Sequence, residues 1–190
     1  MPSKYSLTVE LSKQTARDLS SSPGKYMSFL ITAANNYKYS FADQILIYAQ
    51  KPSATACAEI ETWNKLGRWV NKGTKGITLL VDRDIPYKLR HVFDIADTNS
   101  RYGREVKLWA MKDEYAEQVI DDLENSFGEL EDKSSFEKAV IGIAETAVQD
   151  NYSDYLEQLS AVFDGSFLED LDEDTLRQQF RDLLIDSVAF

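Results

Sequence analysis

The sequence contains few of the residues on which disulfides, metal sites and acid–base catalysis depend: one cysteine and one histidine among 190 residues. A single cysteine, Cys57, excludes an internal disulfide and is typical of a reducing compartment, so we expect a cytoplasmic protein. A single histidine, His91, excludes a zinc site built on two histidines. No apolar run approaches the roughly 20 residues that span a bilayer, and the N-terminus lacks the apolar segment of a secretion signal. We therefore expect no membrane association.

Motifs of nucleotide binding and catalysis are also missing from the sequence. It contains no Walker A segment, no Gly-x-Gly-x-x-Gly fingerprint and no Gly-x-Ser-x-Gly elbow. The acidic cluster at 169–174, EDLDED, lacks the spacing of a calcium-binding loop. These absences predict a protein without catalytic residues, metal or cofactor, and therefore not an enzyme.

Positive charge is scarce overall, but it is unevenly distributed. The formal net charge is −11. Residues 1–110 carry 16 Lys and Arg against 10 Asp and Glu, whereas residues 111–190 carry 5 against 22. The two parts therefore have net charges of +6 and −17. This asymmetry predicts a basic working domain at 1–110 and an acidic extension at 111–190.

Hydrophobic periodicity predicts an α+β fold, in which N-terminal helices pack on a small, mostly antiparallel sheet and an all-helical acidic region follows. Ser3 or Ser12 is a candidate N-cap for the first helix, the sequence SSSPG at 20–24 ends it, and Ser40 is a candidate N-cap for the third. The segment 54–57 is either a short strand or a loop. The remaining expected elements are a helix at 26–34, a short helix at 59–66, strands at 68–70, 77–81, 91–95 and 106–109, and helices at 112–125, 134–152, 153–163 and 173–188.

The run TWNKLGRWVNKGTKGITLL at 62–80 combines tryptophans, cations and glycines on an expected hairpin between strands 68–70 and 77–81. Aromatic rings stack on bases, cations pair with phosphates, and glycine permits close approach of a strand to the backbone. This combination is typical of binding to single-stranded nucleic acid. Its basic character is not a consequence of the overall composition, which is acidic.

The segment 39–80 resembles the N-terminal single-stranded-DNA-binding domain of ArdC-type antirestriction proteins. It resembles still more closely the N-terminal domain of large helicase- and methylase-type proteins on conjugative elements of Firmicutes. The matching features are a helix with Gln44 and Tyr48, an Ala-Thr-Ala stretch, Thr62-Trp63, Gly67-Arg68-x-Val70 and Lys72-Gly73-x-Lys75-Gly76-Ile77. Further along, Val92-Phe93-Asp94 and Asp97-Thr98 resemble the family's second strand, where the family usually has Gln at the position of Asp97. The zinc motif of the ArdC metallopeptidase domain is absent, so that activity is not implied.

Residues and resemblance together predict a set of nucleic-acid-binding residues: Asn36, Tyr39, Gln44, Tyr48, Trp63, Arg68, Trp69, Lys72 and Lys75. Alternatives stay open for several of them. Trp63 lies in helical register with Ile60 and Leu66, so a position in the core is the alternative for this residue. Strand alternation places Trp69 on the side opposite its neighbours, and the two lysines on a turn are exposed in any case.

We therefore expect a non-catalytic, single-stranded-DNA-binding domain of a mobile-element protein, with DNA as its partner. In the alternative interpretation the protein is a protein–protein or antirestriction module whose acidic helices imitate DNA for a protein partner. The final LLIDSVAF has no helix stop signal, so we expect the chain to be part of a longer protein.

Overall fold

The computed structural model describes residues 2–81, 87–100, 103, 105–159 and 164–190. The chain divides into two compact units, unit 1 (Met1–Leu108) and unit 2 (Trp109–Phe190). In chain order the elements of unit 1 are α1 (Lys4–Ser20), α2 (Pro23–Asn35), α3 (Phe41–Gln50), β1 (Cys57–Ala58), α4 (Ile60–Lys65), β2 (Arg68–Val70), β3 (Ile77–Leu80), β4 (Leu89–Asp94), the 3-10 helix η1 (Ile95–Asp97) and β5 (Thr98–Ser100). Those of unit 2 are the 3-10 helix η2 (Asp113–Tyr115), α5 (Ala116–Phe127), α6 (Phe136–Leu159) and α7 (Glu173–Ala189).

The N-terminal helices of unit 1 begin at hydrogen-bonded caps. Ser3 accepts a hydrogen bond from the backbone N–H of Ser6 at the start of α1, and Ser40 accepts one from Asp43 at the start of α3. Each cap satisfies a backbone donor that the first helical turn leaves without a partner. Pro23 opens α2, where its fixed φ and missing N–H are tolerated. The predicted cap at Ser40 is confirmed, and of the two candidates for α1 the structure selects Ser3.

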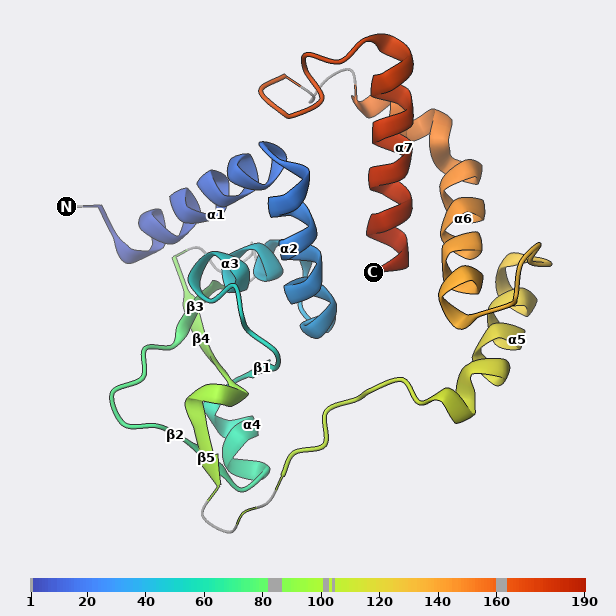
Figure 1. The fold of residues 1–190 in the computed structure, drawn as a ribbon. Coiled ribbons are helices and arrows are strands. Elements are labelled where there is room, and N and C mark those ends of the chain that lie inside the picture. Colours follow the sequence, from blue (N-terminus) through green and yellow to red (C-terminus); the bar gives the residue numbers. More distant parts are fainter. Residues whose placement is uncertain (1, 82–86, 101–102, 104, 160–163) are drawn as a thin grey trace. The chain divides into compact units, whose positions relative to one another are not determined.

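Two small antiparallel sheets complete unit 1. In the first, β4 lies between β1 and β3, and in the second β2 pairs with β5. Figure 1 shows α1, α2 and α3 gathered at one end of the unit, with α4, β2 and β5 at the other. The strand β4 connects these two ends. The predicted α+β class is confirmed.

The core of unit 1 lies between the helices and the face of β3 and β4. One cluster of buried residues joins α3 to these strands: Leu46, Ile47, Ala54, Ile77, Leu79 and Val92. A second joins the helices to one another: Leu19, Phe29, Leu30 and Ile45. Both clusters remove apolar surface from water, which is the main driving force for folding.

The predicted hairpin between 68–70 and 77–81 is wrong. Trp69 lies opposite Asn99 of β5, and Thr78 lies opposite His91 of β4, so β2 and β3 belong to different sheets. The segment between them makes its hydrogen bonds elsewhere, because the backbone N–H of Asn71 donates to the carbonyl of Asp97 (2.9 Å). This bond ties the end of β2 to the segment that leads into β5.

The predicted strand at 106–109 is also wrong. Residues 105–110 have no regular structure, and both Leu108 (47% exposed) and Trp109 (79% exposed) face solvent. Alternating apolar residues form a strand only where a neighbouring strand supplies hydrogen bonds and a core covers one face. No strand in the described part of the chain lies beside this segment.

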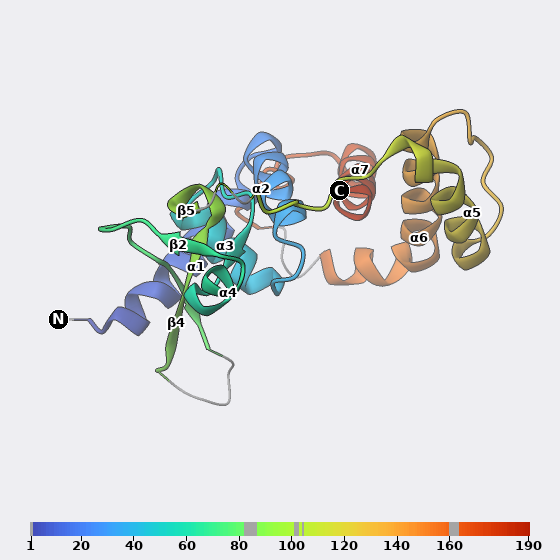
Figure 2. The same ribbon diagram turned by 90° about the horizontal axis from the view of Figure 1, so that it is seen from below.

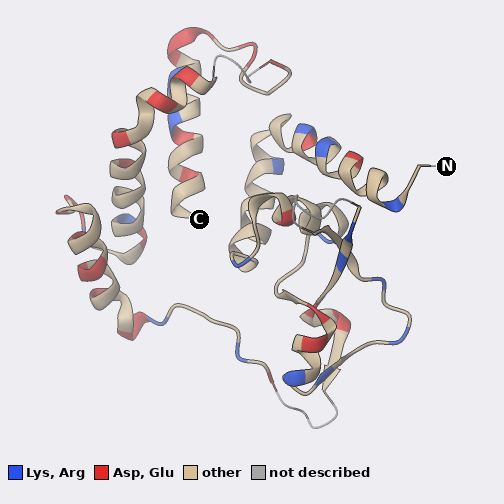
Figure 3. Ribbon diagram, turned by 180° about the vertical axis from the view of Figure 1, so that it is seen from behind, with Lys and Arg blue, Asp and Glu red and all other residues tan. Residues whose placement is uncertain are grey.

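In unit 2 the described residues form helices and connecting segments only. The predicted helices at 134–152 and 153–163 are one continuous helix, α6, as far as Leu159, and residues 160–163 lie outside the described residues. A buried cluster joins α5 to α6: Ile120, Leu130, Ala139 and Ile143. The hydroxyl of Tyr152 on α6 donates to the carbonyl of Arg177 on α7 (2.7 Å). Figure 3 shows Asp and Glu distributed along all three helices.

Candidate nucleic-acid interface

The loop between β2 and β3, Asn71–Gly76, carries two exposed lysines; we call it the basic loop. Figures 1 and 2 show it projecting outward from the body of unit 1. At its base, the side-chain amide of Asn99 donates to that of Asn71 (2.6 Å), and the N–H of Thr74 closes a turn onto the Asn71 carbonyl (3.1 Å). Gly73 has φ +87°, a conformation that glycine adopts without strain. The loop therefore holds Lys72 and Lys75 in solvent on an anchored base.

Strand β2 displays Trp69 on the outer side and anchors Arg68 on the inner side. Arg68 and Val70 are half-buried, whereas Trp69 is 39% exposed, as strand alternation predicts. The guanidinium of Arg68 donates from Nε to Thr98 Oγ1 (2.7 Å) and from Nη2 to the Thr98 carbonyl (2.8 Å). Arg68 thus fixes β2 against β5, and this arrangement presents the Trp69 ring at the start of the basic loop.

Three of the residues that the sequence nominated for binding hold unit 1 together from within. Trp63 is 2% exposed, and its Nε1 donates to the carbonyl of Phe93 (2.8 Å). Asn36 is buried; its amide donates to Ala54 O (3.2 Å) and accepts from the N–H of Cys57 (3.1 Å). The amide of Gln44 donates to the carbonyl of Asn36 (3.2 Å). Asn36 anchors the segment after α3, Gln44 anchors the segment between α2 and α3, and Trp63 ties α4 to β4. Trp63 in this position cannot offer a face to a base.

Tyr39 and Tyr48 occupy intermediate positions. The hydroxyl of Tyr39 donates to the carbonyl of Cys57 (2.9 Å), and the guanidinium of Arg90 lies 5.6 Å from the centre of its ring. Burial, followed by the negative charge of the Cys57 thiolate, raises the pKa of Tyr39 to about 12. Tyr48 packs edge-on against Phe29, with ring centres 5.8 Å apart. Both rings pack against buried residues of α3, and both precede the basic loop by more than 20 positions in the sequence.

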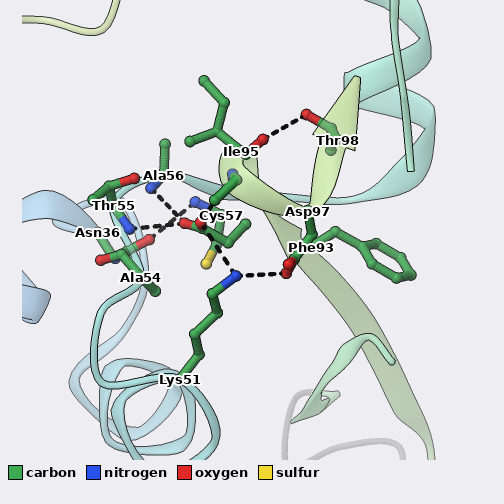
Figure 4. Close-up of polar contacts among 12 residues, drawn as sticks. Asn36, Lys51, Ala54, Thr55, Ala56, Cys57, Phe93, Ile95, Asp97 and Thr98 are labelled. Atoms are coloured by element: carbon green, nitrogen blue, oxygen red, sulfur yellow. Dashed lines mark hydrogen bonds and ion pairs between the residues drawn. The ribbon is translucent and has the colours of Figure 1, made fainter. Parts of the chain in front are cut away.

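A buried carboxylate, Asp94, organises the centre of unit 1. Figure 4 labels three residues that contact it, Lys51, Thr55 and Ala56. Its Oδ2 accepts hydrogen bonds from the N–H groups of Thr55 (2.7 Å) and Ala56 (3.0 Å), and its Oδ1 accepts one from Ala96 (3.0 Å). The ammonium of Lys51 lies 3.5 Å from Asp94 Oδ1 and 2.8 Å from Asp97 Oδ2. The carboxylate therefore joins the segment after α3 to the start of η1.

Those contacts also fix the charge on Lys51. Burial acts to lower the pKa of Lys51, but the hydrogen bond to Asp97 and the negative charges of Asp94 and Asp97 outweigh it. The pKa of Lys51 therefore lies above its ordinary value. Lys51 is a permanent cation at neutral pH, held in place by its two acidic neighbours.

Beside Lys51, the surface of unit 1 is hollowed over a volume of about 530 Å³. We call this depression the cationic hollow. It is lined by residues from α1, the end of α3, the basic loop, β4 and η1, including Lys4, Gln50, Lys51, Lys75, His91 and Asp97. Of these residues, the sequence predicted only Lys75 as a nucleic-acid-binding residue. Lys4 and His91 are 87 positions apart, and no local pattern signals that they meet.

The imidazole of His91 is neutral in this setting. Lys4 Nζ lies 2.9 Å from His91 Nε2, and an ammonium can only donate, so Nε2 accepts and the ring proton is on Nδ1. Partial burial, and then the charge of Lys4, lower the pKa of His91 below its ordinary value. The hollow thus combines three ammonium groups with one uncharged imidazole.

Other kinds of site are not found in the described residues. They contain no group of three or more His, Cys, Asp or Glu side chains placed to hold a metal ion. Burial, then the charge of Asp94, raises the pKa of the Cys57 thiol to about 12, so this thiol is almost fully protonated at neutral pH. None of the helices in the described ranges has the length and apolarity that crossing a membrane requires.

Comparison with known proteins assigns a family to unit 1. No curated protein and no solved structure matches the chain. Residues 9–108, slightly more than half of the chain, match the family described as the N-terminal domain of anti-restriction factor ArdC. This range contains β1–β5, the basic loop, Trp69 and the Asp94 centre, and it excludes unit 2. The chain therefore belongs to the family of the N-terminal domain of anti-restriction factor ArdC.

Proposed function

We propose that unit 1 is a non-catalytic domain that binds single-stranded DNA through Trp69 and the basic loop. The observation that carries the proposal is the projecting loop with its exposed Lys72 and Lys75, which begins just after the strand that displays the exposed Trp69 ring. Bases stack on such a ring regardless of their sequence, while lysines neutralise phosphates. Membership of the family of the N-terminal domain of anti-restriction factor ArdC supports the coarser part of this proposal, an antirestriction-related function that involves DNA.

The rest of unit 1 supports this mechanism by rigidity. Arg68 is hydrogen-bonded to Thr98, and Asn71 is hydrogen-bonded to Asp97 and Asn99. The basic loop and the Trp69 ring are therefore already ordered before DNA binds. A pre-ordered surface loses less conformational entropy when a ligand binds. We propose that this domain is part of a larger mobile-element protein, as its sequence resemblance implies. We also propose that it works in the cytoplasm, because a single cysteine is typical of a reducing compartment.

The direct test is fluorescence anisotropy with a labelled single strand of about 20 nucleotides and the matching duplex, with the full chain at low salt. Trp69→Ala should weaken binding about 5- to 150-fold, since one stacked base contributes about 1–3 kcal/mol. Trp69→Phe, which keeps a ring, should retain most of the affinity. Lys72→Gln should weaken binding several-fold and make the log–log salt slope less steep by about 0.7.

The matched control is Lys25→Gln, which removes the same charge from the exposed surface of α2. Its affinity should lie within twofold of the unmodified chain. The proposal is wrong if the duplex binds as tightly as the single strand, or if the Trp69 and Lys72 variants behave like this control.

The alternative function, in which unit 2 imitates DNA for a protein partner, is favoured by one observation. Residues 111–190 carry 22 acidic against 5 basic side chains, and the acidic ones lie along all three helices (Figure 3). This function predicts that the full chain inhibits a restriction endonuclease in vitro even with Trp69→Ala and Lys72→Gln. It further predicts that neutralising the acidic side chains of α6 abolishes inhibition. The opposite pattern would exclude it.

A further inference from the structure

The cationic hollow lies next to the basic loop and shares Lys75 with it. Lys4 reaches it from the first turn of α1, and Lys51 reaches it from the C-cap of α3. Both are far from the loop in sequence, so folding is required to bring the three ammonium groups around one depression. Lys4 and Lys75 are exposed, whereas the Lys51 side chain is 24% exposed and paired with Asp97.

The charge in the hollow is positive. Among the described residues that line it, three are lysines and one, Asp97, is acidic. Lys51 lies 2.8 Å from Asp97 and 3.5 Å from Asp94, so these carboxylates offset its charge, and the charges of Lys4 and Lys75 remain available to an anion. The volume of about 530 Å³ falls in the range of small-molecule sites, and accommodates a phosphate together with part of its sugar.

We propose that the cationic hollow is a binding subsite for one phosphate group of the DNA strand, with Lys4 and Lys75 as its direct contacts and with Lys51, whose charge Asp94 and Asp97 offset, as part of its wall. This inference rests on the proposed function, because the loop that holds the strand also supplies Lys75. It extends the interface from the loop to α1 and α3. A strand held at Trp69 continues along Lys72 and Lys75 into the hollow.

His91 makes the subsite responsive to pH. In the free protein its Nε2 accepts a hydrogen bond from Lys4 of α1. The other charged groups that line the same hollow are Lys51 at the C-cap of α3, Lys75 of the loop and Asp97 of η1. A phosphate that draws the ammonium of Lys4 away frees Nε2 and adds a negative charge nearby. Both changes favour the imidazolium form, so binding is coupled to uptake of a proton.

The chain has one histidine, so its imidazole resonances in an NMR spectrum belong to His91 without further assignment. The experiment follows these resonances from pH 5 to 8 in the full chain, with and without inorganic phosphate, against sodium chloride at equal ionic strength. The subsite predicts a saturable shift with phosphate and a higher His91 pKa in its presence. A response identical to that of chloride would overturn the subsite.

The second arm uses oligonucleotides of about 12 nucleotides with a 5′-hydroxyl or a 5′-phosphate. If both oligonucleotides shift the His91 resonances, an internal backbone phosphate occupies the hollow. If only the 5′-phosphorylated oligonucleotide shifts them, its terminal phosphate occupies the hollow. Either result supports the subsite and identifies the source of the phosphate. Absence of a shift with both strands, despite binding, would refute its role in strand binding.

Lys4→Gln is the decisive variant, because Lys4 is exposed and lies outside the basic loop. It should abolish the phosphate-dependent shift of His91 and weaken strand binding about three- to tenfold at low salt. Its matched control is Lys13→Gln, which removes the same charge from an exposed position on the same helix. In addition, the unmodified chain should bind the strand more tightly at pH 6 than at pH 8. This difference should disappear in the His91→Gln variant.

Failure of the subsite is distinguishable from failure of the proposed function. If Trp69→Ala weakens strand binding while Lys4→Gln equals Lys13→Gln, the subsite is wrong and the proposed function stands. If inorganic phosphate shifts His91 saturably but no strand binds, the hollow is an anion site and the proposed function is wrong.

Discussion

Replacement of Asp94 by asparagine tests whether this buried carboxylate stabilises the fold of unit 1. Asp94 is fully buried, accepts three backbone hydrogen bonds and lies 3.5 Å from the ammonium of Lys51. Asparagine has nearly the same shape, but only one of its two side-chain atoms can accept. Its amide nitrogen would face either the N–H of Ala96 or the N–H groups of Thr55 and Ala56, and donors would then oppose donors.

The size of the effect follows from these contacts. A hydrogen bond to a charged group contributes about 1.5–3 kcal/mol, and removing one partner of a buried ion pair costs about 3–5 kcal/mol. At least one backbone donor is left buried without an acceptor, and Lys51 retains Asp97. We expect Asp94→Asn to lower the free energy of unfolding by about 3–5 kcal/mol.

The matched control is Asp97→Asn. Asp97 also pairs with Lys51, but its side chain is 26% exposed, so its loss should cost about 1 kcal/mol or less. Urea unfolding of the full chain, followed by tryptophan emission, measures both variants. Trp63 is 2% exposed and should dominate the change, since Trp109 is already 79% exposed in the native protein. Equal stability of the two variants would refute the central role assigned to Asp94.

Three further predictions concern the packing and the pH dependence of unit 1. Gly76→Ala places a Cβ 3.0 Å from the Phe93 ring, so stability should fall by about 1–2 kcal/mol in urea unfolding; unchanged stability would contradict this close packing. Trp63→Phe leaves the Phe93 carbonyl without its indole donor, so the free energy of unfolding measured by calorimetry should fall by about 1 kcal/mol or more. A smaller loss would argue against that hydrogen bond. Burial raises the pKa values of Cys57 and Tyr39 to about 12. Because the unfolded chain releases these protons first, the free energy of unfolding should be fully retained below about pH 9 and fall between about pH 9 and 12, whereas a flat profile would contradict the burial of these groups.

Local signals in the sequence predicted much of the fold. Serine caps, the Ser-Pro-Gly break and 3.6-residue periodicity act within one helical turn, and they located the start of α3 at Ser40 and the short helix α4. Strand pairing is not local. The three-residue strand β2 pairs with residues about 30 positions away in β5, and β3 pairs with β4, so the loop between β2 and β3 is not a hairpin turn.

The same distinction applies to the candidate site. Alternation along β2 predicted the outward position of Trp69, and the composition of the basic loop predicted exposed lysines. Asn36 and Gln44, nominated from a polar patch and a resemblance, have hydrogen-bond partners inside the fold that no spacing reveals. The approach of Lys4 to His91 depends on the packing of α1 near β3 and β4, and so could not be read from the sequence.

The central claim is that a cationic surface of unit 1 binds single-stranded DNA, and the salt dependence of affinity for a single strand of about 20 nucleotides tests it most directly. Lys72 and Lys75, with a third contact from Lys4, predict a log–log slope between about −1.4 and −2.1. They also predict weaker binding to the matching duplex at every salt concentration. A slope near zero, or equal affinity for the duplex, would contradict the account.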